Sequence, residues 1–226
     1  DRNCCLYGVF DGHGGSRAAE FCVKHLVNNL TGDPNFPGNP TRALTNAFLN
    51  TDSAFLDLAR SHRPPLDDGT TAVTALVFGD QLWVANAGDS RAVLVQQQGH
   101  VVPMSEDHKP NRPDETARIK RAGGTVYFHG VWRVGGILAV SRAIGDRMLK
   151  PYVTAEPEIR QWRVTPADLY LVLASDGLWD VISNDEVAQI VSTMTEPQFA
   201  AQKLVREALT RGSADNVTCL VIDLQR

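Results

Sequence analysis

The sequence predicts an α+β fold in which helices cover the outer faces of antiparallel sheets. Two helical stretches lie near the start of the chain, and in each of them apolar residues recur at the spacing of one helix face. Strand-like runs at 70–78, 81–86 and 91–96 follow, joined by Gly-Asp turns that are typical of hairpins. Amphipathic helices and hairpins each bury one face, so we expect them to stack in layers.

Local signals predict the first elements. An apolar strand at 4–10 leads into the stretch VFDGHGG (9–15), whose glycines turn the chain into the first helix. Asn39 is placed to cap the second helix, and Pro40 suits its first position, where no backbone N–H is needed. The apolar stripes of the two helices are Phe21, Cys22, Leu26 and Leu30, and Leu44, Phe48, Thr51, Phe55 and Leu58.

The composition of the chain changes near its middle. Residues 106–136 are polar, contain Pro and paired Gly, and hold one amphipathic helix at about 115–121. This composition predicts an irregular lobe over the surface, of the kind that often carries binding specificity. The regular elements expected after it are a buried strand at 168–175, a helix with a capping box at 183–186, a helix from Pro197 to Gly212 and a last strand at 217–224.

Length and composition are those of a globular protein. The 226 residues suffice for a large core, and we expect one domain, 1–226, and a monomer. The net charge of −4 without a basic patch argues against a nucleic-acid partner, and no apolar run is long enough to cross a membrane. The four cysteines lack disulfide or metal spacing, which indicates a reducing compartment, cytoplasmic or nuclear, with a removed organellar leader left open.

Aspartates recur at the ends of the predicted strands. The set comprises Asp11, Asp89, Asp146, Asp176, Asp180 and Asp215. Any one of them alone is most simply a turn residue, because Asp hydrogen-bonds its own backbone in turns. Together they would be costly without cations, and only Arg91 and Arg147 lie beside these turns in the sequence. A cluster of hard divalent ions such as Mg²⁺ or Mn²⁺, which prefer oxygen ligands, would neutralise them.

The stretch VFDGHGG fits a metal site better than a nucleotide loop. The sixth residue counted from Gly12 is Arg17, so the GxGxxG pattern fails, and the Walker, EF-hand and zinc patterns are absent. Gly12 has no side chain, which leaves its carbonyl open to a metal-bound water. His13 stands two residues after Asp11, near enough to reach an atom bonded to the ions. We therefore interpret the stretch as a metal site.

Seven motifs together resemble those of the metal-dependent type 2C serine/threonine protein phosphatases. They are VFDGHGG, GTTA, NAGDSRAVL, DHKPNRPDETARIKRAGG, LAVSRAIGD, LASDGLWDV and SADNVT, in the family's order and spacing over essentially the whole chain. The resemblance implies a β-sandwich of two antiparallel sheets flanked by helix pairs, in α-β-β-α layers, with a metal cluster at one end. Residues 106–136 match the family's flap, which is thought to shape substrate choice.

The resemblance also implies a set of metal ligands. Asp11 matches the carboxylate that bridges two Mn²⁺ or Mg²⁺ ions, and Gly12 the glycine that contributes its carbonyl. Asp176 and Asp215 match the other carboxylates of this pair. Asp89, with Asp176, matches the ligands of a weaker third ion.

The implied reaction is hydrolysis of phosphoserine and phosphothreonine in proteins. Asp180 matches a residue that holds metal-bound water, and His13 matches the proposed general acid. Two metal ions lower the pKa of a shared water, so that hydroxide is available at neutral pH. The leaving alkoxide is strongly basic, and a proton from His13 should assist it. Cys4 and Cys5 lack the loop context of a cysteine phosphatase.

Two alternatives stay open. Family members carry an N-terminal segment with a phosphate-gripping arginine and an acidic pair, and we expect this chain to lack that strand segment. Its absence would favour an inactive or weakly active member that acts as a protein-binding scaffold, whereas the intact Asp11, Asp176 and Asp215 favour the enzyme. The other alternative is a hydrolase of small phosphate esters, which the long flap disfavours.

Four more residues have expected roles beside the motif aspartates. Asp146 is equally suited to the metal shell and to a structural turn. Arg142 and Arg147 could hold phosphate, but we favour ion pairs, for which Asp146 is the candidate partner. We expect His108 to order the base of the flap rather than to take part in catalysis.

Overall fold

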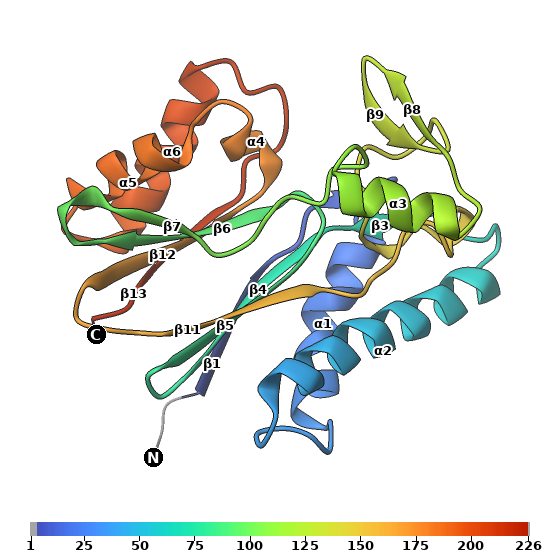
Figure 1. The fold of residues 1–226 in the computed structure, drawn as a ribbon, viewed down its shortest axis with the longest axis horizontal. Coiled ribbons are helices and arrows are strands. Elements are labelled where there is room, and N and C mark those ends of the chain that lie inside the picture. The colour runs from blue at the N-terminus through green and yellow to red at the C-terminus, as the bar shows by residue number, and fades with distance from the viewer. Residues whose placement is uncertain (1–3, 226) are drawn as a thin grey trace.

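The structure, a computed structural model that describes residues 4–225, shows four layers (Figure 1). Two four-stranded antiparallel sheets lie face to face, and helices cover the outer face of each. The predicted α+β sandwich with flanking helices is therefore confirmed. Within the described residues, no helix is both long and apolar enough to cross a membrane.

The first sheet has the strand order β1–β4–β5–β11. Its strands span Cys4–Val9, Ala72–Phe78, Gln81–Ala87 and Glu158–Arg163. The helices that cover it are α1 (Arg17–Thr31) and α2 (Pro40–Ser61), which pack their buried stripes against β4 and β5. The side chain of Asn39 accepts a hydrogen bond from the Arg42 backbone N–H and Pro40 begins the helix, so the predicted cap is confirmed.

The second sheet has the order β13–β12–β6–β7. Its strands span Cys219–Asp223, Asp168–Ala174, Arg91–Gln96 and Val101–Pro103. The covering helices are α4 (Asp176–Trp179), α5 (Asn184–Ser192) and α6 (Pro197–Thr210). The predicted capping box of α5 is present, because Ser183 and Glu186 bond each other's backbone N–H groups.

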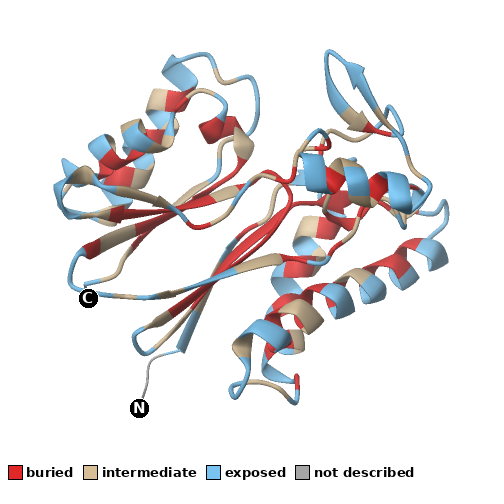
Figure 2. Cartoon of the chain, in the orientation of Figure 1, coloured by how far each residue is buried: buried red, intermediate tan, exposed pale blue. Residues whose placement is uncertain are grey.

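Apolar side chains from both sheets fill the space between them. The cluster includes Val73 and Val84 from the first sheet and Leu94, Leu171 and Leu173 from the second, all buried. Figure 2 shows this as continuous buried colour along the central strands, whereas the helices are buried on one side only. The rigid sandwich therefore fixes the strand ends from which the predicted site residues project.

Two small sheets complete the fold. One has the order β10–β3–β2, formed by Ile144–Gly145, Gly69–Thr70 and Gly12–His13. The other is the hairpin of β8 (Val126–His129) and β9 (Val131–Val134), which stands out from the sandwich in Figure 1. The remaining helical elements are α3 (Pro113–Arg121) and 3₁₀ turns at Gln97–Gly99 and Arg147–Leu149.

The prediction for 106–136 was incomplete. It gave one helix in an irregular lobe, and α3 is indeed there, but the β8–β9 hairpin was not predicted. The hairpin turns at Gly130, whose φ of 74° suits glycine. Most of its side chains are exposed, so it lacks the buried-face alternation by which strands are recognised.

Candidate metal centre

A three-stranded sheet at one end of the sandwich brings His13 and Asp146 together. β2 ends at His13 and directly follows Asp11, while β10 ends just before Asp146, and both pair with β3 between them. Gly69 of β3 makes the meeting possible, because a Cβ at that position would overlap both Asp146 Oδ2 and His13 Nε2. The glycine thus opens a gap across which the two side chains bond.

The His13–Asp146 pair is closely bonded. His13 Nε2 donates to Asp146, with both carboxylate oxygens at 2.9 Å, and Asp146 is only 6% exposed. Burial opposes the charged imidazolium, but the hydrogen bond and charge of Asp146 outweigh it, so the pKa of His13 lies above its ordinary 6.5. Asp146, for which a metal-shell and a turn role were weighed, holds His13 from a left-handed backbone position (φ 51°) at the start of the 3₁₀ turn.

Thr71 joins the loop of Asp11 to the loop of Asp89. The Asp11 N–H donates to Thr71 Oγ1 at 3.3 Å, and the Thr71 N–H donates back to the Asp11 carbonyl at 2.9 Å. Thr71 Oγ1 also shares a hydrogen bond of 2.7 Å with Ser90 Oγ. Gly88 (φ 122°) lies so close to Thr71 that a Cβ there would overlap it. The role of Thr71 was not assigned from sequence, although it belongs to the GTTA motif.

The second sheet supplies Asp176 and the loop of Asp215. Asp176 begins α4 directly after β12, where Ser175 Oγ donates to the Asn216 carbonyl at 3.2 Å and accepts from the Thr218 N–H at 3.0 Å. A Cβ on Gly177 would overlap the Asn216 carbonyl. Close backbone packing at this glycine thus holds the Asp215 loop against the end of β12.

Nearby acids raise the pKa of both Asp11 and Asp176. For Asp11, burial raises the pKa first, and the charges of Asp215 and Asp89 raise it further. For Asp176, burial and then Asp89 are the main causes that raise the pKa from 3.8 to about 7, and Asp11 and Asp180 add to them. Like charges shift a pKa in this way only when they are close. The structure therefore brings five of the six predicted aspartates into one electrostatic cluster, which comprises Asp11, Asp89, Asp176, Asp180 and Asp215.

The cluster is chemically suited to a hard cation. Asp176 Oδ1 is buried and has no hydrogen-bond partner among the described residues. A buried carboxylate oxygen without a partner is costly, and a divalent ion would satisfy it and relieve the repulsion. Gly12 is exposed beside Asp11, as a carbonyl ligand requires. Residues 4–225 contain no group of three His, Cys, Asp or Glu side chains already at metal-binding spacing.

Lys109 is a site residue that the sequence-based reasoning missed. Its Nζ contacts Asp89 Oδ2, and although burial opposes its charge, the attraction of Asp89 raises the pKa of Lys109. Only Arg91 and Arg147 had been counted as nearby cations. Arg91 is held by Asp107 at 2.8 Å and Asn184 at 2.9 Å. The available signal for Lys109 was the DHKP motif, in which it follows His108.

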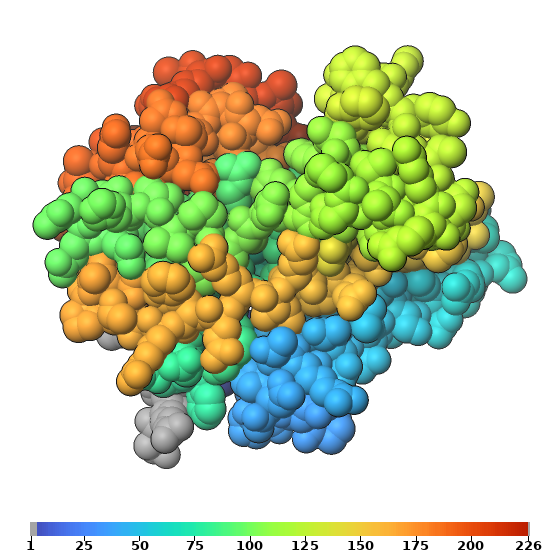
Figure 3. Space-filling view, in the orientation of Figure 1, coloured from blue at the N-terminus to red at the C-terminus, as the bar shows by residue number. Residues whose placement is uncertain are grey.

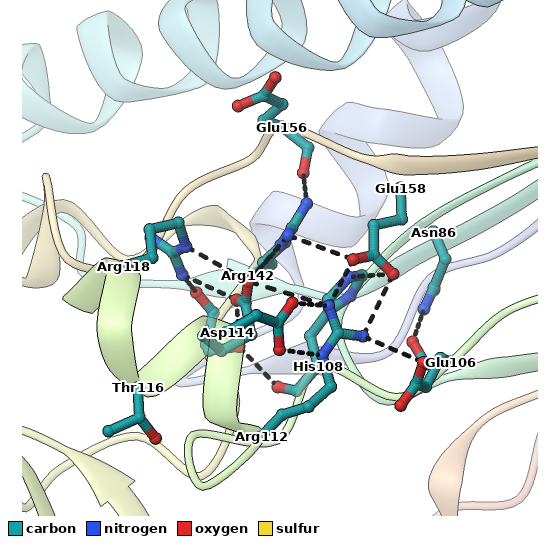
Figure 4. Close-up of polar contacts among 12 residues, drawn as sticks. Asn86, Glu106, His108, Arg112, Asp114, Thr116, Arg118, Arg142, Glu156 and Glu158 are labelled. Atoms are coloured by element: carbon teal, nitrogen blue, oxygen red, sulfur yellow. Dashed lines mark hydrogen bonds and ion pairs between the residues drawn. The ribbon is translucent and has the colours of Figure 1, made fainter.

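A buried ion network anchors the flap to the sandwich (Figure 4). Glu115 of α3 is 1% exposed and accepts hydrogen bonds from Arg142 at 2.7 Å, Arg118 at 2.8 Å and Ser141 Oγ at 2.6 Å. Burial alone would raise the pKa of Glu115, but these bonds hold it well below its usual range. The network ties α3 to the segment that leads into β10 and Asp146.

His108 lies under the same network. It is fully buried, with Nε2 3.3 Å from Glu158 Oε2, and its Nδ1 accepts from the Gly88 N–H at 3.1 Å. The Ser141 N–H donates to its carbonyl at 2.8 Å. His108 therefore connects the flap base to the loop that carries Asp89, a structural position of the kind expected.

The two arginines proposed for ion pairs form them, with other partners than expected. Arg142 pairs with Glu115, and Arg147 pairs with Asp67 at 2.9 Å. Asp146, the partner considered from the sequence, is paired with His13 instead. Asp146 pairs with His13 because β10 and β2 both pair with β3. The distance between residues along the sequence does not reveal this pairing.

A cleft of about 380 Å³ lies between the acid cluster and the flap. One wall contains Asp89, Asp176 and Asp180, and Lys109 lies beside them. The flap hairpin contributes Phe128, Val131 and Trp132 to the lining. Figure 3 shows a hollow between the yellow-green flap and the orange-red helices.

Comparison with known proteins gives consistent matches over the chain. The family model "Protein phosphatase 2C" matches residues 3–217. "Probable protein phosphatase 2C 52" of Oryza sativa subsp. japonica is 50% identical over 226 residues, which is 100% of this chain and 45% of that protein. "Probable protein phosphatase 2C 69" of Arabidopsis thaliana is 52% identical over 217 residues, 96% of this chain and 60% of that protein.

The fold matches solved structures as well. The crystal structure of a serine-threonine phosphatase 2C from Toxoplasma gondii aligns with a TM-score of 0.87 at 28% identity, over 97% of this chain and 84% of that one. A C. elegans sex-determining protein aligns with a TM-score of 0.87 at 27% identity, over 98% of this chain and 56% of that one. The chain spans about half the length of the curated relatives it matches. On its motifs, its sandwich fold and these matches, the chain belongs to the protein phosphatase 2C family.

Proposed function

We propose that the chain hydrolyses phosphoserine and phosphothreonine in proteins with two Mn²⁺ or Mg²⁺ ions, and with a weaker third ion. The carrying observation is the convergence of strand-end aspartates around Asp176 Oδ1, a buried atom without a hydrogen-bond partner in residues 4–225. Asp11, Asp176, Asp215 and the Gly12 carbonyl would hold the pair, with Asp89 serving the third ion and Asp180 a water. Bound ions would supply activated water and offset phosphate charge.

In this proposal His13 is the proton donor. Asp146 accepts the hydrogen bond of Nε2, and Nδ1 has no hydrogen-bond partner within residues 4–225, so Nδ1 is free to donate to a leaving oxygen. The raised pKa of His13 favours the protonated imidazole, the form that a general acid requires. Asp146 fixes the ring orientation and stabilises its charge. Thr71 links the Asp11 loop to the Asp89 loop through its hydroxyl.

We propose one catalytic domain over 1–226 with a flap at 106–136, phosphorylated proteins as substrates, and a monomer. Neither nucleic acid nor a membrane is part of the proposed interaction. The four cysteines, all free in the structure, support a cytoplasmic or nuclear setting.

Metal binding tests the proposal without relying on turnover. Titration calorimetry with Mn²⁺ should detect at least two ions on the chain, and Asp11→Asn should abolish the tighter binding. The matched control is Asp80→Asn, because Asp80 lies in the exposed β4–β5 turn at the opposite end of β4 from Asp11. Equal binding by all three proteins, or none by the unmodified chain, would contradict the proposal.

A further inference from the structure

The flap hairpin exposes an unusual set of large apolar side chains. Phe128 is 63% exposed, Val131 48% and Trp132 42%, although aromatic residues normally bury most of their surface. Phe128 and Trp132 contact each other edge to face at 5.3 Å between ring centroids, so they form one surface. The hairpin projects from the sandwich, and no other strand of the described residues pairs with β8 or β9 (Figure 1).

This apolar surface faces the acid cluster across one cleft. Phe128, Val131 and Trp132 line the same cavity of about 380 Å³ as Asp89 and Asp176. A volume of that size is in the lower range of ligand sites, enough for a phosphorylated side chain and one large neighbouring side chain. The cleft is therefore polar where a phosphate would react and apolar on the opposite wall.

We propose that Phe128, Val131 and Trp132 bind a large apolar side chain of the substrate, close in sequence to its phosphoserine or phosphothreonine. The inference rests on the proposed function and narrows its substrate class to phosphopeptides with an apolar neighbour. The occupant is the substrate itself, because the apolar wall is continuous with the cleft in which the phosphate would lie. Aromatic side chains have few rotatable bonds. They therefore lose less conformational entropy on binding an apolar side chain than long flexible side chains would.

The size of the effect follows from area. Partial burial of one Leu or Phe side chain corresponds to about a tenfold gain in kcat/KM, since full burial is worth about ten- to a hundredfold. The gain should appear mainly in KM, because this contact forms on binding and is far from the bond that breaks.

The test compares two phosphothreonine peptides that differ only at the two residues on each side of the phosphothreonine. One carries Leu at these positions and the other Ser. Phe128→Thr and Trp132→Thr remove the rings while keeping a residue that favours strands. Tyr127→Thr is the matched control, because Tyr127 is 56% exposed on the same hairpin but does not line the cleft. Circular dichroism checks that each variant is folded.

We expect the chain and Tyr127→Thr to prefer the Leu peptide about tenfold, and the other two variants to lose most of that preference. Equal kcat/KM for both peptides with the unmodified chain, or a preference that survives both ring removals, would overturn the inference. Hydrolysis of p-nitrophenyl phosphate distinguishes a failure of the flap inference from a failure of the proposed function. Activity on this ester without a peptide preference refutes only the flap surface, whereas no metal-dependent activity on any substrate refutes the proposed function.

Discussion

Asp176→Asn should stabilise the metal-free protein while removing its response to metal. Burial and the nearby Asp89 raise the pKa of Asp176 from 3.8 to about 7, so the ionised carboxylate opposes folding at neutral pH. An amide keeps nearly the same shape and removes the charge. If Asp176 served folding alone, its substitution would lower the free energy of unfolding, because most point substitutions destabilise a protein.

The magnitude follows from the pKa. At about 1.4 kcal/mol per pH unit, the rise from 3.8 to about 7 corresponds to about 4 kcal/mol at pH 8. Asp176 is partly exposed, so solvent screening reduces this to about 2–4 kcal/mol. A folded-state pKa above the unfolded one means that the penalty is absent below pH 3.8, grows as the pH rises to 7 and is constant above it.

Thermal unfolding in EDTA at pH 8 and pH 4 measures this. At pH 8 the Tm of Asp176→Asn should exceed that of the unmodified chain by about 5–15 °C, and at pH 4 the two should nearly coincide. Mn²⁺ should raise the Tm of the unmodified chain but not that of the variant. Asp80→Asn, at an exposed turn, should gain nothing. A lower Tm for Asp176→Asn in EDTA at pH 8 would refute the reasoning.

Three further substitutions are informative. His13→Ala should slow phosphopeptide hydrolysis by about 10²- to 10⁴-fold but affect p-nitrophenyl phosphate far less, and equal slowing would rule out the acid role. Glu115→Gln should lower the free energy of unfolding in urea by about 3–5 kcal/mol, because it removes the buried charge that the half-buried Arg118 and Arg142 share. The arginines hold the pKa of Glu115 below 4.5, so this contribution is present above pH 4.5 and lost as the pH falls, and a loss unchanged at pH 3 would contradict it. Lys109→Met should tighten Mn²⁺ binding in calorimetry, since Lys109 competes with a cation for Asp89, and weaker binding would count against that competition.

Local signals were enough to predict most of the fold. The Asn39 cap, the capping box at Ser183 and the hairpin turn at Gly79-Asp80 are short-range patterns, and each is present as predicted. The second hairpin, predicted at Gly88-Asp89, is wrong, because β5 and β6 lie in different sheets and the turn passes from one sheet to the other. β11 was not predicted, because it lies at a sheet edge and four of its six residues are charged or polar, which hides the apolar pattern of a strand. Edge strands avoid aggregation with such charges, so their sequence resembles that of a loop.

The candidate site was predictable in its carboxylates but not in their counter-charges. Asp11, Asp89 and Asp176 each stand at a strand end, which their own neighbours in the sequence reveal. The bond from His13 to Asp146 joins residues 133 positions apart and depends on a glycine in a third strand. Similarly, Lys109 reaches Asp89 from the flap, 20 residues away. Such pairings arise from strand order, which no local pattern contains.

Release of phosphate from a phosphothreonine peptide by this 226-residue chain, with and without EDTA, tests the central claim most directly. We predict activity that EDTA abolishes and that added Mn²⁺ restores, and that Asp176→Asn lacks under both conditions. Phosphate release that persists in EDTA would contradict a metal-dependent site, as would a folded, Mn²⁺-binding chain that releases none.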